Sequence, residues 1–135
     1  MKFVIKKPSK ELNQYIQHFW MIDGGLTDQS EYIQRIIPNG LFEITFYIKN
    51  KPISINNKKH TIYNSQLKGQ LKDYFDIKTS STISLFSVYF KPQGLSVFLD
   101  FPLKELYNQI IPLSYLLKND SIRLEDELQS LNTFE

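Results

Sequence analysis

Arg35 and Glu43 are the charged residues whose placement most suggests a site. They lie in two runs, 32–37 and 41–48, that are rich in β-branched and aromatic residues and flank Pro38-Asn39-Gly40. A three-residue hairpin loop, in which the glycine takes the left-handed conformation, sets Arg35 directly opposite Glu43. The sequence therefore predicts a cross-strand ion pair. Such a pair could be purely structural, or it could be the polar end of a ligand site.

Aromatic side chains could complete a cavity around this pair. In the predicted hairpin, Thr45 and Tyr47 share a face with the two charges, and that face could point into a β-barrel. The candidate ligand-binding residues are Arg35, Glu43, Tyr47, Trp20, Phe46 and Tyr89, with Phe90 as a further lining residue. For each aromatic residue taken singly, the alternative is a place in the ordinary hydrophobic core.

Residues for other chemistry are scarce. The chain has no cysteine, and its two histidines, His18 and His60, each lack a second histidine at metal-ligand spacing. Gly24-Gly25 precedes no helical pattern and so makes no phosphate loop, and the serines have no recognisable histidine partner. We therefore expect no catalytic residues, no metal and no cofactor.

Length and composition bound the class of protein. The 135 residues suffice for one domain, and the 41% hydrophobic content can fill a core. No apolar run approaches the roughly 18 residues of a membrane helix. With no cysteine as well, the expectation is a soluble, cytoplasmic protein that binds no membrane. The net charge is +2 and only two basic residues are arginine, so we expect no DNA binding by this chain alone.

Residues 1–135 are predicted to form a single domain with two regions that differ in residue composition. Short runs rich in Ile, Phe, Tyr and Thr dominate residues 15–91, which is typical of an antiparallel structure of many strands. Ahead of them, a short helix capped by Ser9 is expected to give way to a strand near Tyr15. From residue 93 onward leucines recur at helical spacing. The predicted fold class is mainly β with α: an antiparallel β-barrel or sandwich over about 8–92, followed by C-terminal helices over about 93–133.

A leucine stripe near the C-terminus could join two copies of the chain. Leu124, Leu128 and Leu131 fall on one side of the last predicted helix, among acidic and polar residues. The stripe could pack on the barrel of its own chain, or it could form a dimer seam.

Several motifs occur in a characteristic order. The motifs are Tyr15-Ile16 with Phe19-Trp20, Arg35-Ile36-Ile37-Pro38-Asn39-Gly40 with Glu43, Gly69, Val88 to Gly94, Phe101-Pro102-Leu103 with Leu106 and Asn108, and Ile111-Pro112-Leu113. In this order the chain resembles the N-terminal sensor region of AraC-type bacterial transcriptional regulators. Asn39 stands where that group usually has aspartate, Ser87 and Tyr89 where it has glycine and arginine, and Gln93 where it has glycine.

This resemblance implies a fold, a function and partners. The fold would be a cupin-like barrel followed by helices. It would sense a small-molecule effector and hold two regulators together as a homodimer. DNA would be contacted only through a helix-turn-helix half that this chain lacks. The alternative is a purely structural dimerisation or interaction module, with a filled barrel and no ligand.

Overall fold

A computed structural model describes residues 2–23, 31–55, 61–80, 82–91, 93–98 and 103–117. About half of the expected helical extension lies outside these residues, including everything from residue 118 onward and thus the candidate dimerisation residues Leu124, Leu128 and Leu131. The described elements, in chain order, are β1 (Lys2–Lys6), β2 (Ile16–Asp23), β3 (Glu31–Ile36), β4 (Phe42–Lys49), β5 (Ile53–Ile55), β6 (Ser65–Lys68), β7 (Phe75–Ser80), β8 (Ser84–Phe90), α1 (Leu95–Phe98), the 3₁₀ helix η1 (Leu103–Leu106), β9 (Ile110–Pro112) and α2 (Ser114–Leu117).

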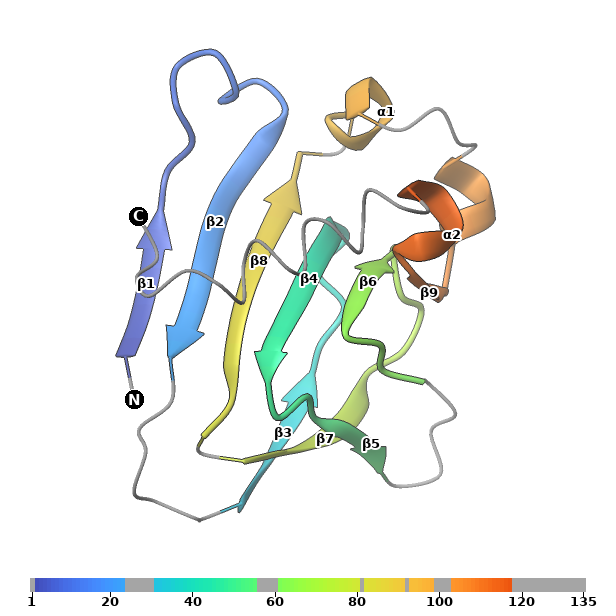
Figure 1. Ribbon diagram of the computed structural model, residues 1–135. Coiled ribbons are helices and arrows are strands. Elements are labelled where there is room, and N and C mark those ends of the chain that lie inside the picture. Colours follow the sequence, from blue (N-terminus) through green and yellow to red (C-terminus); the bar gives the residue numbers. More distant parts are fainter. Residues whose placement is uncertain are drawn as a thin grey trace.

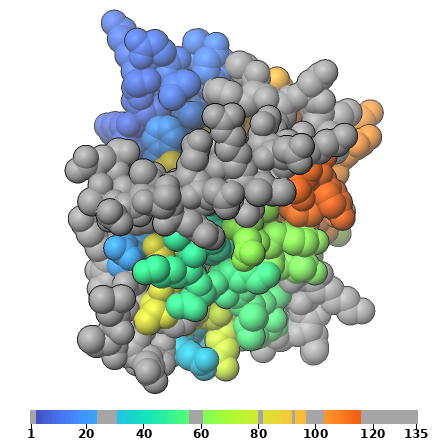
Figure 2. All heavy atoms as spheres, viewed as in Figure 1, coloured from blue at the N-terminus to red at the C-terminus, as the bar shows by residue number. Residues whose placement is uncertain are grey.

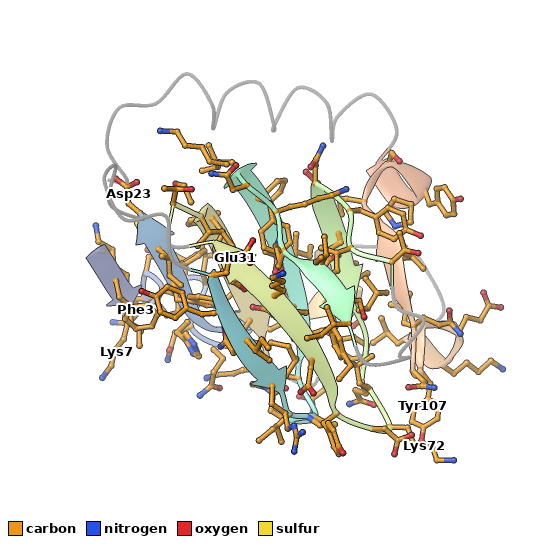
Figure 3. All side chains as sticks on the ribbon, turned by 90° about the horizontal axis from the view of Figure 1, so that it is seen from below. Phe3, Lys7, Asp23, Glu31, Lys72 and Tyr107 are labelled. Carbon is orange, nitrogen blue, oxygen red and sulfur yellow. The ribbon has the colours of Figure 1, made fainter. Side chains whose placement is uncertain are left out.

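The described strands form two antiparallel sheets. The larger has the order β1-β2-β8-β4-β6-β9, and the smaller has the order β3-β7-β5 (Figure 1). From β2 to β8 successive strands alternate between the two sheets, the even-numbered strands in the larger and the odd-numbered in the smaller. Seen from below, the smaller sheet lies in front of the larger, with Phe3 near one side and Tyr107 near the other (Figure 3). The prediction of a mainly β, antiparallel fold is confirmed, but the sheets do not close into a barrel.

The predicted hairpin between residues 32–37 and 41–48 was wrong. The turn itself forms as expected, because Gly40 has a φ of 75° and the Leu41 backbone N–H donates to Asn39 Oδ1 over 3.0 Å. However, β3 pairs with β7, whereas β4 lies between β6 and β8 in the other sheet. The turn thus carries the chain from one sheet to the other. In its central position β4 buries both of its faces, which a two-stranded hairpin could not achieve.

The N-terminal segment differs from the expected helix. Leu12 and Asn13 donate backbone hydrogen bonds to Ser9 O, and Tyr15 and Ile16 donate to Leu12 O, which makes two successive turns. The predicted change to a strand near Tyr15 is confirmed, since β2 begins at the next residue. The edge strand β1 was not predicted. The N-terminal residues, blue in Figure 2, stand at one corner of the surface.

After β8 the described helical elements are short. Elements α1, η1 and α2 each span four residues. Residues 110–112, which were expected to follow helical spacing up to Pro112, instead form the edge strand β9 beside β6. An edge strand tolerates proline because one row of its backbone groups makes no ladder bonds. None of the described helices has the length and apolar character needed to cross a membrane.

One face of the larger sheet carries the main hydrophobic core. Buried side chains from four of its strands pack with residues of the first turns, of α1 and of η1: Ile16, Phe42, Leu67, Val88, Phe90, Leu95 and Leu106. Because side chains alternate along a strand, the opposite face of the same strands turns toward the smaller sheet. That second face holds the polar residues.

Candidate ligand-binding site

A cavity of about 410 Å³ lies between the two sheets. Every strand from β1 to β4 and from β6 to β8 contributes lining residues, which include Trp20, Glu43, Tyr47, Lys68, Thr79 and Tyr89. The volume falls within the range of small-molecule sites, about 300–1,000 Å³.

Glu43 is the centre of the polar floor of this cavity. Its Oε2 accepts hydrogen bonds from Trp20 Nε1, over 2.9 Å, and from the Ser87 hydroxyl. Its Oε1 lies 2.9 Å from Lys68 Nζ. The Thr45 and Ser87 hydroxyls are 3.0 Å apart. Since the one proton of Ser87 goes to Glu43, Thr45 donates to Ser87.

Strand register brings these side chains together. Glu43 lies opposite Tyr89 on β8 and opposite Lys68 on β6, and Trp20 on β2 lies opposite Ser87. These side chains therefore form a short row across four neighbouring strands, β2, β8, β4 and β6. The buried carboxylate is satisfied from both sides, as a group in a low-dielectric setting requires.

Two tyrosines near Glu43 hold their protons more tightly than usual. Burial raises the pKa of Tyr47 well above its ordinary value of 10, and the charge of Glu43 raises it further. The pKa of Tyr89 is raised by burial first and by Glu43 second, with a smaller opposing effect from the side chain of Asn39. Both residues are therefore neutral phenols, and hence hydrogen-bond donors, at neutral pH.

Aromatic rings form the wall beside this floor. The rings of Trp20 and Tyr89 stack with centroids 6.5 Å apart. Phe3 lies 5.8 Å from Trp20, and His18 lies 5.0 Å from Tyr89. All four residues line the cavity. The wall is therefore suited to an apolar or aromatic body.

Arg35 lines the cavity but does not pair with Glu43, so the predicted ion pair was wrong. It lies opposite Asp76 across β3 and β7, and its Nε is 3.0 Å from Asp76 Oδ1. Its guanidinium carbon is 4.1 Å from the centroid of the Tyr74 ring. The contact with Asp76 raises the pKa of Arg35. The Arg35 side chain is 55% exposed, which puts it at the edge of the site rather than on its floor.

Four of the other candidates line the cavity, whereas Phe46 does not. Trp20, Glu43, Tyr47 and Tyr89 are among its lining residues. The ring of Phe46 is 6.4 Å from that of Phe86, and Phe90 belongs to the core on the opposite face of the larger sheet. The reason is alternation, because even-numbered residues of β4 and β8 face away from odd-numbered Glu43 and Tyr89.

Sequence reasoning missed several polar residues of the site. Gln66 and Lys68 line the cavity from β6, and Ser87 lies beneath Glu43. Polar and apolar residues alternate in Gln66-Leu67-Lys68, which is typical of a strand with one polar face. Ser87 interrupts the apolar run of β8 in the same way. In the part of the chain that the structure describes, no group of three or more His, Cys, Asp or Glu residues could hold a metal ion.

Fold and site together define a class: β proteins of two facing antiparallel sheets that enclose a cavity with a buried charged floor. Residues 6–112 match a family described as a domain of unknown function, DUF6597, and the chain belongs to this family. The matched region runs from the end of β1 to the end of β9 and so includes every described strand except most of β1. Comparisons with curated proteins and with solved structures found no match.

Proposed function

We propose that this chain is the ligand-sensing and dimerisation domain of an AraC-type transcriptional regulator, and that a small-molecule effector binds between its sheets. The observation that carries the proposal is the cavity of about 410 Å³, with Glu43 and Lys68 on its floor and aromatic walls. The role is binding rather than catalysis. DNA is contacted through a separate DNA-binding half.

The strand order supports the cupin-like part of this proposal. Strands β2 to β8 alternate between two facing sheets, with neighbours β2-β8-β4-β6 in one and β3-β7-β5 in the other. This alternation is that of a jelly roll, the architecture to which cupins belong. The AraC-type assignment itself rests on the order of the sequence motifs.

A ligand in this cavity can act on the regions outside it. It would contact both sheets, and β8 carries Tyr89 on the cavity face and Phe90 in the core beneath α1 and η1. A ligand shifts the protein only if it binds one arrangement of these parts more tightly than another. Tighter binding to the dimeric arrangement would link effector and dimerisation.

The alternative is an interaction module with no ligand. Its interior would be expected to be filled by side chains, because an empty cavity forfeits packing contacts. The cavity between the sheets and its buried charged groups favour the sensor over this alternative.

A ligand screen by thermal unfolding tests the proposal. Trp20 is the single tryptophan of the chain and lines the cavity, so its fluorescence also reports binding there directly. We expect hits to raise the Tm of the wild type and to do so less in Glu43→Gln and Arg35→Ala. Tyr115→Phe, on an exposed side chain that is not among the lining residues, serves as the control. Equal Tm shifts in all four proteins would contradict ligand binding in this cavity. Sedimentation with and without a hit tests the link to dimerisation.

A further inference from the structure

We propose that the cavity selects largely apolar, flat molecules that present a carbonyl or carboxylate oxygen to Gln66 and Lys68. This inference rests on the proposed ligand-sensing function and names the chemical class of its ligand. It follows from which hydrogen-bonding groups of the cavity are already engaged and which are left for a ligand.

The strongest acceptor of the site is already occupied. One carboxylate oxygen of Glu43 accepts hydrogen bonds from Trp20 and Ser87, and the other forms an ion pair with Lys68. Besides burial, the charge of Glu43 acts on the Tyr89 phenol beside it and raises the pKa of that phenol. A carboxylate offers about four lone-pair positions, so Trp20, Ser87 and Lys68 use most of its capacity. A ligand that carried only donors would find no free strong acceptor on this floor.

Gln66 lines the cavity and has a donor group left for a ligand. Its Oε1 accepts a hydrogen bond from the Tyr63 backbone N–H over 3.1 Å. Because a backbone N–H can only donate, this contact decides which end of the amide is oxygen. The NH₂ end has no hydrogen-bond partner among the described residues, although the residue is 4% exposed and lines the cavity. The NH₂ group is therefore a donor that no described residue engages.

Lys68 supplies further donors next to Gln66. Its ammonium has three N–H groups, and Glu43 is its one ion-pair partner among the described residues. Gln66 and Lys68 are two positions apart on β6, so they share a face and lie roughly 7 Å apart along the strand. One oxygen-bearing group with two acceptor positions could therefore reach both side chains.

Two hydroxyl groups extend the set of donors. Thr79 lines the cavity from the smaller sheet, and its buried hydroxyl has no hydrogen-bond partner within the described residues. Tyr47 also lines the cavity, and no hydrogen bond to its hydroxyl is found in the described part of the chain. Like any tyrosine it is protonated at neutral pH, and its raised pKa keeps it protonated in moderately alkaline solution as well. A hydroxyl can donate or accept, so these groups suit a carbonyl or carboxylate without requiring one.

The charges of the site disfavour a cation. Lys68 is balanced by Glu43, and Arg35 is balanced by Asp76. The donors that remain carry positive or partially positive hydrogen atoms, which would repel an ammonium group. Apolar and aromatic walls favour a ligand whose remaining surface is apolar. The site is thus complementary to an apolar body with one neutral or anionic acceptor group.

Four naphthalenes that differ in one substituent form the test, measured by calorimetric titration of the chain. They are 2-acetylnaphthalene, 2-naphthoate, 2-ethylnaphthalene and 2-(aminomethyl)naphthalene. We expect the ketone, the carboxylate or both to bind at least tenfold more tightly than the ethyl compound, and the ammonium compound to bind most weakly. The first two compounds distinguish a neutral acceptor from an anionic one.

The variant Gln66→Glu turns the side-chain donor of Gln66 into an acceptor of the same shape. It should reduce the preference for the ketone and carboxylate by tenfold or more and improve binding of the ammonium compound. If this variant does not fold, the pair Glu43→Gln/Lys68→Met, which removes both charges together, should lower the preference instead. Thr79→Val, of equal size, is the matched variant in the smaller sheet. It should weaken the binding of the ketone and the carboxylate by a smaller factor.

The outcomes separate the inference from the proposed function. Binding of the ethyl compound as tightly as the ketone and carboxylate would overturn the inference and leave ligand sensing in place. An unchanged preference in a folded Gln66→Glu variant would overturn it too. Failure of all four compounds to bind, together with no hit from the broader thermal screen, would overturn both.

Discussion

Glu43 and Lys68 lie opposite each other on β4 and β6, and their charged atoms meet 2.9 Å apart in the interior of the protein. The two side chains are 5% and 12% exposed. Each charged group is largely excluded from water, so its lost hydration is compensated by the opposite charge of its partner. The consequences for stability are therefore unequal for single and paired substitutions.

Lys68→Met should destabilise the protein by about 3 kcal/mol, because it leaves the Glu43 carboxylate buried without its cation. The double variant Glu43→Gln/Lys68→Met should recover most of this loss. Denaturant unfolding of both single variants and the double variant measures the coupling. Glu31→Gln breaks the more exposed Glu31–Lys78 pair and should cost less than about 0.5 kcal/mol. Additive losses in the cycle would contradict the predicted coupling.

Ser87→Ala should destabilise the protein by about 1–3 kcal/mol, because it removes a donor to Glu43 and an acceptor for Thr45. Ser65→Ala is the matched control. The Ser65 hydroxyl is also buried but has no hydrogen-bond partner in the described part of the chain, so its removal should be neutral or stabilising. Equilibrium unfolding in urea gives both values. Equal losses of stability in Ser87→Ala and Ser65→Ala would contradict a stabilising role for the hydrogen bonds of the Ser87 hydroxyl.

Stability should fall in alkaline solution because of Tyr47 and Tyr89. Their pKa values are raised in the native protein, whereas an unfolded tyrosine ionises near its ordinary pKa of 10. Above pH 10 the unfolded chain thus binds fewer protons than the native protein, and the free energy of unfolding decreases with rising pH. Below pH 10 this contribution is fully present.

Replacing Tyr47 by Phe tests the direction of this effect. The variant should flatten the decline above pH 10, by at most about 1.4 kcal/mol per pH unit. Tyr115→Phe, on a side chain that is 75% exposed, should leave the slope as in the wild type. Urea unfolding between pH 8 and 11 provides the comparison. An identical slope in wild type and Tyr47→Phe would refute the assignment.

Gly94→Ala and Gly69→Ala should each cost about 3 kcal/mol or more, because the added carbon would meet backbone. A Cβ at Gly94 would lie 1.8 Å from Tyr15 O, and one at Gly69 would lie 1.9 Å from Leu106 O. Gly40→Ala has free space around it and should cost only about 1 kcal/mol for its left-handed conformation. Thermal melts rank the three variants. A Gly40 variant that is less stable than the other two would contradict the close packing of these segments.

The local features of the fold were predictable from the sequence. The β-rich texture, the turn at Pro38-Asn39-Gly40 and the alternation along residues 42–47 all appear in the structure. The same alternation correctly placed Glu43 and Tyr47 on one face. Each of these features depends on the steric preferences of a residue and its immediate neighbours, which are the same in any fold.

The pairing of distant strands was not predictable in this way. The sequence contains Arg35, Glu43, Asp76 and Lys68, and each pairing of opposite charges among them is chemically reasonable. A hairpin would join Arg35 to Glu43. The structure instead places β4 between β6 and β8, which joins Glu43 to Lys68, and places β3 beside β7, which joins Arg35 to Asp76.

By itself, then, the sequence determined the strands from β2 to β8, the turn and the face on which each side chain of β4 lies, but not the edge strands β1 and β9. The tertiary structure decided which strands are neighbours, and with them the polar floor of the cavity and the donors left for a ligand. The physical reason is that turn and strand preferences are local, whereas strand pairing follows from burying whole sheet faces built from segments far apart in the chain.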